Sequence, residues 1–170
     1  LQRKHVYESS LSIYTHLKKT VPVLPEEKGY VLFVGSINPH KGIEYLCEAM
    51  EKAHKEMPHL KLIVAGRGKF WFDVEKYRQQ GFVKFINRFV TAEELSGLIS
   101  NASIVVCPYI DATQSGVIMS AFALDKPVIA TNVGALPEML THERHGLLVP
   151  PRDSDSLSKA ILSLMSSPER

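Results

Sequence analysis

The sequence predicts an α/β fold in which helices cover both faces of one doubly wound, mostly parallel sheet. From Tyr30 onward, short apolar segments alternate with longer segments that have helical spacing. The short segments are apolar throughout, which is typical of strands buried on both faces. Strands that alternate with helices are joined by right-handed crossovers and therefore pair in parallel. We expect residues 29–170 to form this domain and residues 1–28 to be an N-terminal extension or linker.

The predicted extension differs from the rest of the chain in composition. It is polar and basic, with a few apolar residues between Val6 and Leu17 that predict a short, loosely packed helix ending near Lys19. Pro22 and Pro25 then indicate a linker, because proline removes a backbone donor and interrupts regular structure.

The order of elements can be predicted from the apolar pattern and its interruptions. Thr91 and Glu94 have the spacing of a capping box, and Asp153 or Ser154 can cap the last helix. We expect strands at 30–35, 60–65, 83–86, 104–107, 127–131 and 147–149. Between them we expect helices at 42–57, 72–80, 92–101 and 116–124, a short turn at 136–140, and a last helix at 153–166.

Composition and charge narrow the class of protein. The 170 residues fit one domain, 45% of them are hydrophobic and 22% charged, and the net charge is +2. This charge and the lack of a long Lys/Arg run argue against a nucleic-acid partner. Cys47 and Cys107 lie in apolar contexts without metal-ligand spacing, which predicts reduced, buried thiols in a cytoplasmic protein. We also expect no membrane helix and no signal peptide. Because the chain begins with Leu1, we expect a piece of a longer protein.

Small, cationic and hydrogen-bonding residues follow the predicted strands at their carboxyl ends. Doubly wound sheets bind ligands outside these ends. The residue types there favour an anionic ligand that carries hydroxyl groups. The segments concerned are 36–42, 66–69, 87–90, 108–115 and 131–138.

The turn Thr113-Gln114-Ser115-Gly116 stands directly before the apolar helical run 117–124. A glycine turn that opens a helix leaves backbone N–H groups unpaired and directed at one point, with the positive end of the helix dipole behind them. Such a turn can bind a phosphate. The alternative is that the turn is an ordinary polar cap on a buried helix.

Five segments in this order resemble the donor-binding, C-terminal half of the GT-B retaining glycosyltransferases, in particular glycosyltransferase family four (glycosyl transferases group 1). The resemblance covers about residues 30–165 and implies the Rossmann-like half of a GT-B fold. The segments are FVGS with HKGI (33–43), FINRFV (85–90), ATQSGV (112–117), PVIAT with GALPE (127–138), and GLLVPP with Asp153.

The resemblance implies a diphosphate site at the first strand and at the turn before 117–124. Lys41 would be the catalytic residue that stabilises the diphosphate leaving group, and Ser115, Gly116 and Val117 would offer backbone N–H groups to the phosphate. The family commonly carries an Arg where this chain has Ser36, so we expect Ser36 to lie at the phosphate site without supplying that charge. Arg67 is an alternative source of that positive charge, although the glycines around it are better explained by a tight turn.

The resemblance also implies sites for the base and the ribose. Backbone groups at Asn87, Arg88 and Phe89 would bind the base edge, unless Phe89 is an ordinary core aromatic. Many family members carry two Glu eight positions apart, and in this chain those positions are Ala112 and Ser120. The nearest polar substitutes for ribose binding are Asp111, Gln114 and Ser120 itself.

These observations predict the donor-binding domain of a retaining glycosyltransferase that moves a sugar from a UDP-, GDP- or ADP-sugar to a polysaccharide or glycolipid acceptor. We expect no metal and no further cofactor. The parent protein would add an N-terminal acceptor-binding domain and could associate peripherally with the inner face of the membrane through that half. The isolated domain would bind its donor weakly and transfer nothing. The alternatives are a non-catalytic nucleotide-sugar-binding relative or scaffold subunit, and a GT-B-like nucleotide-sugar epimerase.

Overall fold

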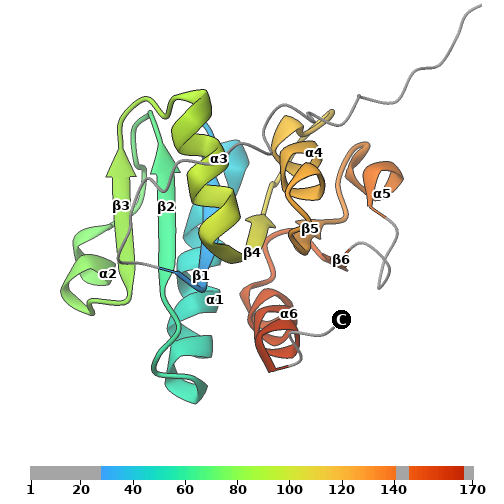
Figure 1. The fold of residues 1–170 in the computed structure, drawn as a ribbon. Helices are drawn as coiled ribbons and strands as arrows, with labels where there is room; N and C mark the ends of the chain where they lie inside the picture. Colours follow the sequence, from blue (N-terminus) through green and yellow to red (C-terminus); the bar gives the residue numbers. More distant parts are fainter. Residues whose placement is uncertain (1–27, 141–145, 167–170) are drawn as a thin grey trace, which may run out of the picture.

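The computed structural model describes residues 28–140 and 146–166, which form one sheet of six parallel strands with helices on both faces (Figure 1). The strand order is β3-β2-β1-β4-β5-β6, which confirms the predicted doubly wound fold. The strands are β1 Tyr30–Val34, β2 Leu62–Gly66, β3 Val83–Asn87, β4 Ala102–Cys107, β5 Val128–Thr131 and β6 Gly146–Val149. The helices are η2 Pro39–Lys41, α1 Ile43–Glu56, α2 Glu75–Gln79, α3 Ala92–Asn101, α4 Gly116–Ala123, α5 Leu136–Met139 and α6 Ser154–Ser166.

The sheet changes direction between β1 and β4. The chain runs outward from β1 through β2 to β3, and then returns to pair β4 with the other side of β1. All of β1, β2 and β5 is buried, as their unbroken apolar sequences predict, whereas the edge strand β3 is partly exposed. The loops that follow β1 and β4 are therefore neighbours at the carboxyl edge, where doubly wound sheets bind ligands.

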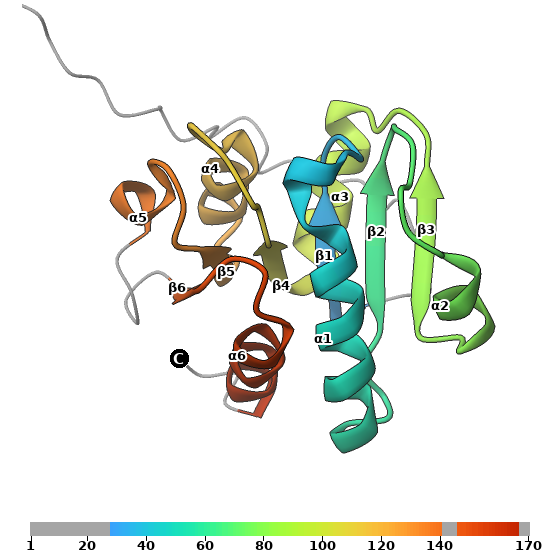
Figure 2. The same ribbon diagram turned by 180° about the vertical axis from the view of Figure 1, so that it is seen from behind.

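Two helix layers enclose the sheet. Helices α1 and α6 pack together on one face, and α3 and α4 pack together on the other (Figure 2). Helix α1 buries Leu46, Cys47 and Met50 against the sheet. Its Lys52 ammonium lies 2.6 Å from the Asp155 carboxylate at the start of α6, so the two helices are also joined at their surface.

The predicted element boundaries are mostly correct, and the differences have local causes. Strand β2 begins at Leu62 rather than 60, because a turn in which the Leu60 N–H donates to the Met57 carbonyl (3.0 Å) precedes it. Helix α2 is shorter than the predicted 72–80, and Phe72 packs edge-on against Phe70 and Trp71 instead of beginning a helix. The sequence pattern did not predict the 3-10 helix η2.

Two predicted helix caps are present. Thr91 and Glu94 form a reciprocal capping box on α3, and the Asp153 carboxylate accepts a hydrogen bond from the Ser156 N–H (2.9 Å) in the first turn of α6. The predicted helix and linker in 1–27 lie outside the described residues. Within the described ranges, no helix combines the length and the apolar character that crossing a bilayer requires.

Candidate functional site

The loops that follow β1 and β4 are packed directly against each other at the carboxyl edge of the sheet. The Ile110 N–H donates to the His40 carbonyl (2.8 Å). Gly42 has a φ of 61°, and a Cβ at this position would lie 2.1 Å from the Pro108 carbonyl oxygen. Any other residue would therefore force the two loops apart, so the glycine of the sequence His40-Lys41-Gly42 is required for this contact.

The loop after β5 closes on the same region. The Thr131 hydroxyl donates to the Tyr109 carbonyl (2.6 Å), and a Cβ at Gly134 would lie 1.6 Å from the Ala112 carbonyl oxygen. Three loops from three adjacent strands thus form one surface around residues 108–116.

Lys41 is held at this surface by the 3-10 helix η2. The Asn38 side chain caps η2 by accepting a hydrogen bond from the His40 N–H (3.1 Å). The Lys41 Nζ lies 3.7 Å from the centroid of the Tyr109 ring, which is a cation–π contact. The side chain is half-buried, and this burial lowers the pKa of Lys41, although the neighbouring Cys107 acts in the opposite direction.

The N-terminus of α4 lacks the usual side-chain cap. Ser115 occupies the N-cap position with an extended backbone (φ −137°, ψ 108°), and serine there normally accepts a bond from an N–H of the first turn. In this protein the Ser115 side chain makes no such bond, and the first turn of α4 contains no acidic residue. Its hydroxyl is turned inward, 3.3 Å from the Tyr109 hydroxyl and 4.0 Å from the Cys107 sulfur. No side chain of the described residues caps these N–H groups, which leaves them available to an anion.

The loop after β3 is fixed by its own side chains. The Asn87 amide donates to the Gly68 carbonyl (3.1 Å) and accepts from the Gly68 N–H (3.2 Å). The Arg88 guanidinium makes two hydrogen bonds to the Glu94 carboxylate (2.9 and 2.7 Å). The Arg88 bond, together with the Thr91 N–H, lowers the pKa of Glu94 to about 2. Both Asn87 and Arg88 thus use their side chains within the protein.

Phe89 has a different environment from its neighbours. Its ring is 69% exposed, and it is the one large hydrophobic side chain among the described residues that is exposed. The alternative that Phe89 is a core aromatic is therefore wrong. An exposed aromatic at the carboxyl edge of the sheet is available to stack on a ligand ring.

Of the four remaining predicted site residues, three are exposed and one is buried. Asp111 and Gln114 are exposed in the loop before α4. Ser120 is 3% exposed, and its hydroxyl donates to the Gly116 carbonyl (2.9 Å) within α4. Ser36 is exposed, with its hydroxyl accepting from the Asn38 amide (3.1 Å).

The structure therefore brings together Lys41 and Ser115, whereas Asn87–Phe89 lie two strands away at the end of β3. The backbone of Arg67 lies beside the loop that follows β1, since the Arg67 carbonyl accepts a hydrogen bond from the Ile37 N–H (3.0 Å). Tyr109, which touches both Lys41 and Ser115, was not among the predicted site residues. The one sequence signal was an aromatic residue just after a buried strand.

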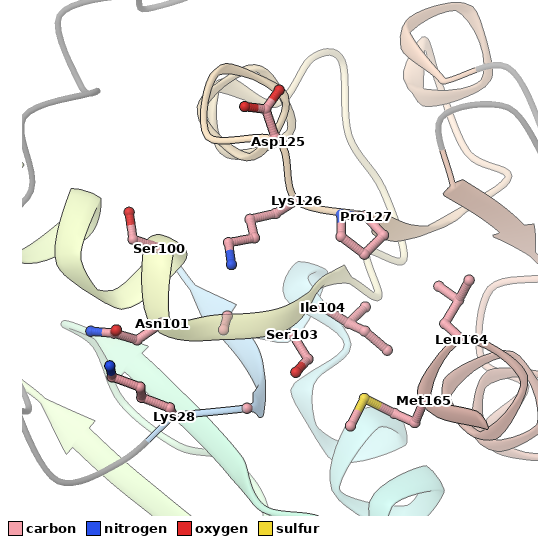
Figure 3. A pocket seen from close by; sticks show the side chains of 12 residues that line it. Lys28, Ser100, Asn101, Ser103, Ile104, Asp125, Lys126, Pro127, Leu164 and Met165 are labelled. Atoms are coloured by element: carbon pink, nitrogen blue, oxygen red, sulfur yellow. The ribbon is translucent and has the colours of Figure 1, made fainter. Parts of the chain in front are cut away.

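A cavity of about 560 Å³ lies at the opposite, amino end of the sheet (Figure 3). Its lining includes Lys28, Asn101, Lys126 and Met165. Lys126 extends into the cavity, and burial lowers its pKa. Helices α3 and α4 end at this side, and the negative ends of their dipoles favour nearby lysines. Lysines near helix C-termini are an ordinary stabilising arrangement, so this cavity is not a second indication of a phosphate site.

Comparison with known proteins gives consistent results. Residues 28–167 match the family described as "Glycosyl transferases group 1". An uncharacterized glycosyltransferase of Methanocaldococcus jannaschii is 33% identical over 155 residues, which is 89% of this chain and 39% of that protein. The phosphatidyl-myo-inositol mannosyltransferase of Mycolicibacterium smegmatis is 27% identical over 83% of this chain and 37% of that protein.

A solved structure supports the fold. The C-terminal domain of a glycosyl transferase group 1 family protein from Francisella tularensis matches with a TM-score of 0.71 and 24% identity, over 95% of this chain and 85% of that chain. The chain spans about two fifths of the length of the two curated relatives, at 39% and 37%.

Proposed function

This chain belongs to the glycosyl transferases group 1 family, and on that premise we propose that it is the donor-binding domain of a retaining glycosyltransferase. The parent enzyme moves a sugar from a nucleoside diphosphate sugar to a polysaccharide or glycolipid acceptor. The observation that carries the proposal is the uncapped N-terminus of α4. Its N-cap residue Ser115 and the Lys41 ammonium both contact Tyr109.

In this proposal the donor diphosphate lies between Lys41 and the first turn of α4. The N–H groups of Ser115, Gly116 and Val117 donate to the phosphate oxygens, and the Lys41 ammonium supplies a full positive charge. When the bond between the sugar and the diphosphate breaks, negative charge accumulates on the leaving phosphate. Groups already oriented toward that charge stabilise it without rearrangement, and this lowers the barrier.

The nucleoside extends from the diphosphate toward β3. Because Asn87 and Arg88 use their side chains within the protein, the base is bound by the backbone of 87–89 and by stacking on the exposed Phe89 ring. Asp111 and Gln114 supply the exposed polar groups for the ribose. The buried Ser120 contributes mainly by its existing bond to the Gly116 carbonyl, which shapes the first turns of α4.

The remaining parts of the proposal concern the parent protein. Its acceptor site lies in an N-terminal domain, so the chain alone binds the donor weakly and transfers nothing. In this proposal the chemistry uses no metal. A cytoplasmic location is supported by the two buried, unpaired thiols of Cys47 and Cys107. The association of the parent with the inner face of the membrane is a separate part of the proposal.

The test is nucleoside diphosphate binding by a Lys41 variant. Removing a charge-assisted contact costs about 1–3 kcal/mol, so Lys41→Ala weakens UDP or GDP binding by roughly fivefold to 150-fold in titration calorimetry. Lys126→Ala is the matched control, because Lys126 is also partly buried with a lowered pKa but lies at the amino end of the sheet. Equal affinity of Lys41→Ala and wild type for both nucleotides would show that the site is wrongly placed.

One observation favours a second candidate, a non-catalytic relative. The positions of the family's two Glu and of its Arg hold Ala112, Ser120 and Ser36 in this chain. Product analysis with the full-length protein separates the possibilities. Transferred sugar supports the glycosyltransferase, donor binding without turnover supports the non-catalytic relative, and an isomerised donor indicates an epimerase.

A further inference from the structure

We propose that Tyr109 is a positioning residue that organises both halves of the diphosphate site, Lys41 and the first turn of α4. The proposal rests on the function proposed above. Tyr109 is 2% exposed, so it acts through its neighbours rather than by touching the donor. Its ring lies under the Lys41 ammonium, its hydroxyl lies beside the Ser115 hydroxyl, and its carbonyl accepts the Thr131 hydroxyl (2.6 Å).

The ring of Tyr109 orients the Lys41 ammonium without neutralising it. The Nζ is 3.7 Å from the ring centroid, and within the described ranges no carboxylate forms an ion pair with Lys41. A carboxylate in the place of the ring would hold the ammonium but would also compete with the diphosphate for it. A neutral aromatic face restricts the side chain and leaves its full charge for the ligand.

The hydroxyl of Tyr109 has a separate effect on α4. Serine is among the best N-cap residues, yet the Ser115 hydroxyl lies 3.3 Å from the Tyr109 hydroxyl and makes no cap. The serine hydroxyl has a single side-chain torsion, so while it lies beside the Tyr109 hydroxyl it does not cap the first turn. The Tyr109 hydroxyl therefore keeps Ser115 turned inward, and the N–H groups that serine would otherwise cap stay open to the phosphate.

The first experiment separates the hydroxyl from the ring. In Tyr109→Phe the Ser115 hydroxyl loses its oxygen partner and keeps only the weak contact with the Cys107 sulfur (4.0 Å). It then caps α4, so the phosphate must displace it. Since an N-cap contributes about 0.5–2 kcal/mol, UDP binding weakens by roughly twofold to thirtyfold in titration calorimetry. Adding Ser115→Ala to Tyr109→Phe removes the competing cap and restores affinity toward wild type. A purely structural role of Tyr109 predicts that the second substitution lowers affinity further or leaves it unchanged, and either result would overturn the proposal.

Tyr30→Phe is the control for loss of a buried phenol hydroxyl. The Tyr30 hydroxyl donates to the Leu98 carbonyl (2.8 Å) at the start of β1, far from the carboxyl edge. This variant should lose stability without a change in UDP affinity. Thermal unfolding of each variant establishes that it is folded before binding is compared.

The second experiment tests the ring and does not require the Tyr109→Phe single variant to fold. UDP binding is measured for Tyr109→Leu/Ser115→Ala and Tyr109→Phe/Ser115→Ala, each with Lys41 and with Lys41→Ala. Losing the ring weakens binding by roughly twofold to thirtyfold when Lys41 is present, the range of a cation–π contact, and has no effect in the Lys41→Ala background. An equal loss in both backgrounds contradicts the role of the ring. If the wild-type chain binds none of UDP, GDP and ADP, the proposed function fails together with this inference. If the wild-type chain binds but the variants do not show the predicted changes in affinity, only the role of Tyr109 is overturned.

Discussion

Helices α3 and α4 begin at the same edge of the sheet and pack on the same face, but their N-termini are completed in opposite ways (Figure 1). In α3, the Thr91 hydroxyl accepts from the Glu94 N–H (3.2 Å) and the Glu94 carboxylate accepts from the Thr91 N–H (2.9 Å). Arg88 then pairs with the same carboxylate. The N-terminus of α3 thus contains its own anion, whereas that of α4 has neither a side-chain cap nor an acidic residue in its first turn.

The residue at the N-cap position therefore does not by itself decide whether a helix start is free for a ligand. Thr91 and Ser115 are both good N-cap residues. The Thr91 hydroxyl caps its helix, while the Ser115 hydroxyl lies beside the buried Tyr109 hydroxyl and turns toward it. The tertiary neighbour of the cap residue determines which terminus stays open.

The largest expected effect comes from closing the α4 terminus with an acid. Gly116 is exposed, and a Cβ there would have no atom within 4 Å, so Gly116→Asp fits without strain. Its carboxylate occupies the positive helix end, and UDP affinity falls by about tenfold or more, while the free energy of unfolding rises by about 0.3–1 kcal/mol. Gly116→Asn, of the same size and uncharged, controls for the added atoms. Equal UDP affinity of the Asp and Asn variants would argue that no phosphate binds at α4.

The next effect is the pH dependence of binding through Lys41. Burial lowers the pKa of Lys41 in the free protein, and a bound diphosphate favours its protonated form. UDP affinity is therefore constant below the free pKa and falls by up to about tenfold per pH unit above it. Calorimetry in the alkaline range measures this slope. Lys41→Arg keeps its charge and should show a flatter profile, so parallel profiles of the two proteins would exclude Lys41 as the titrating group.

Opening the α3 terminus should affect stability and not binding. Thr91→Ala removes one half of the capping box and lowers the free energy of unfolding by about 1 kcal/mol, measured by urea denaturation. UDP affinity stays the same because α3 contains its own anion and holds no phosphate. A tenfold loss of UDP affinity in this variant would remove the distinction between the two helices.

The smallest effect concerns how the free energy of unfolding declines at acid pH. Arg88, and then the Thr91 N–H, hold the pKa of Glu94 at about 2, below its ordinary value of 4.5. A carboxylate whose folded pKa is depressed stabilises the fold above its ordinary pKa, and this contribution is lost as the pH falls toward 2. Glu94→Gln should flatten the decline of stability between these values. An unchanged decline in the variant would indicate that Glu94 is not responsible for it.

Much of the fold and part of the site could be predicted from the sequence. Continuous apolar segments such as 30–34 and 62–66 identify strands because burial on both faces demands them. The capping box is a local pattern of two residues, and it was predicted correctly. The Ser115-Gly116 turn was predicted to be a phosphate-binding site from its glycine and from helix geometry, and its binding role remains a prediction.

Other features depend on partners that are distant in sequence and could not be predicted. Tyr109 gains its importance from Lys41, 68 positions away, whose ammonium lies over its ring. The side chain of Asn87 pairs with Gly68 because β2 and β3 are neighbours. Ser120 differs, because its partner is local. It resembled a ribose ligand by position, yet the helical turn brings its hydroxyl to the Gly116 carbonyl four residues earlier.

The most direct test of the contrast between the two helices is the response of individual backbone N–H groups to a nucleoside diphosphate. Proton–nitrogen NMR spectra of the chain, titrated with UDP and in parallel with GDP, report each N–H separately and tolerate weak binding. We predict that Gly116 and Val117 shift progressively and saturate, while Ala92 and Glu93 in the first turn of α3 stay in place. Shifts of equal size at both helix starts, or saturable shifts confined to other regions, would contradict the claim that α4 alone of the two is open to the donor phosphate.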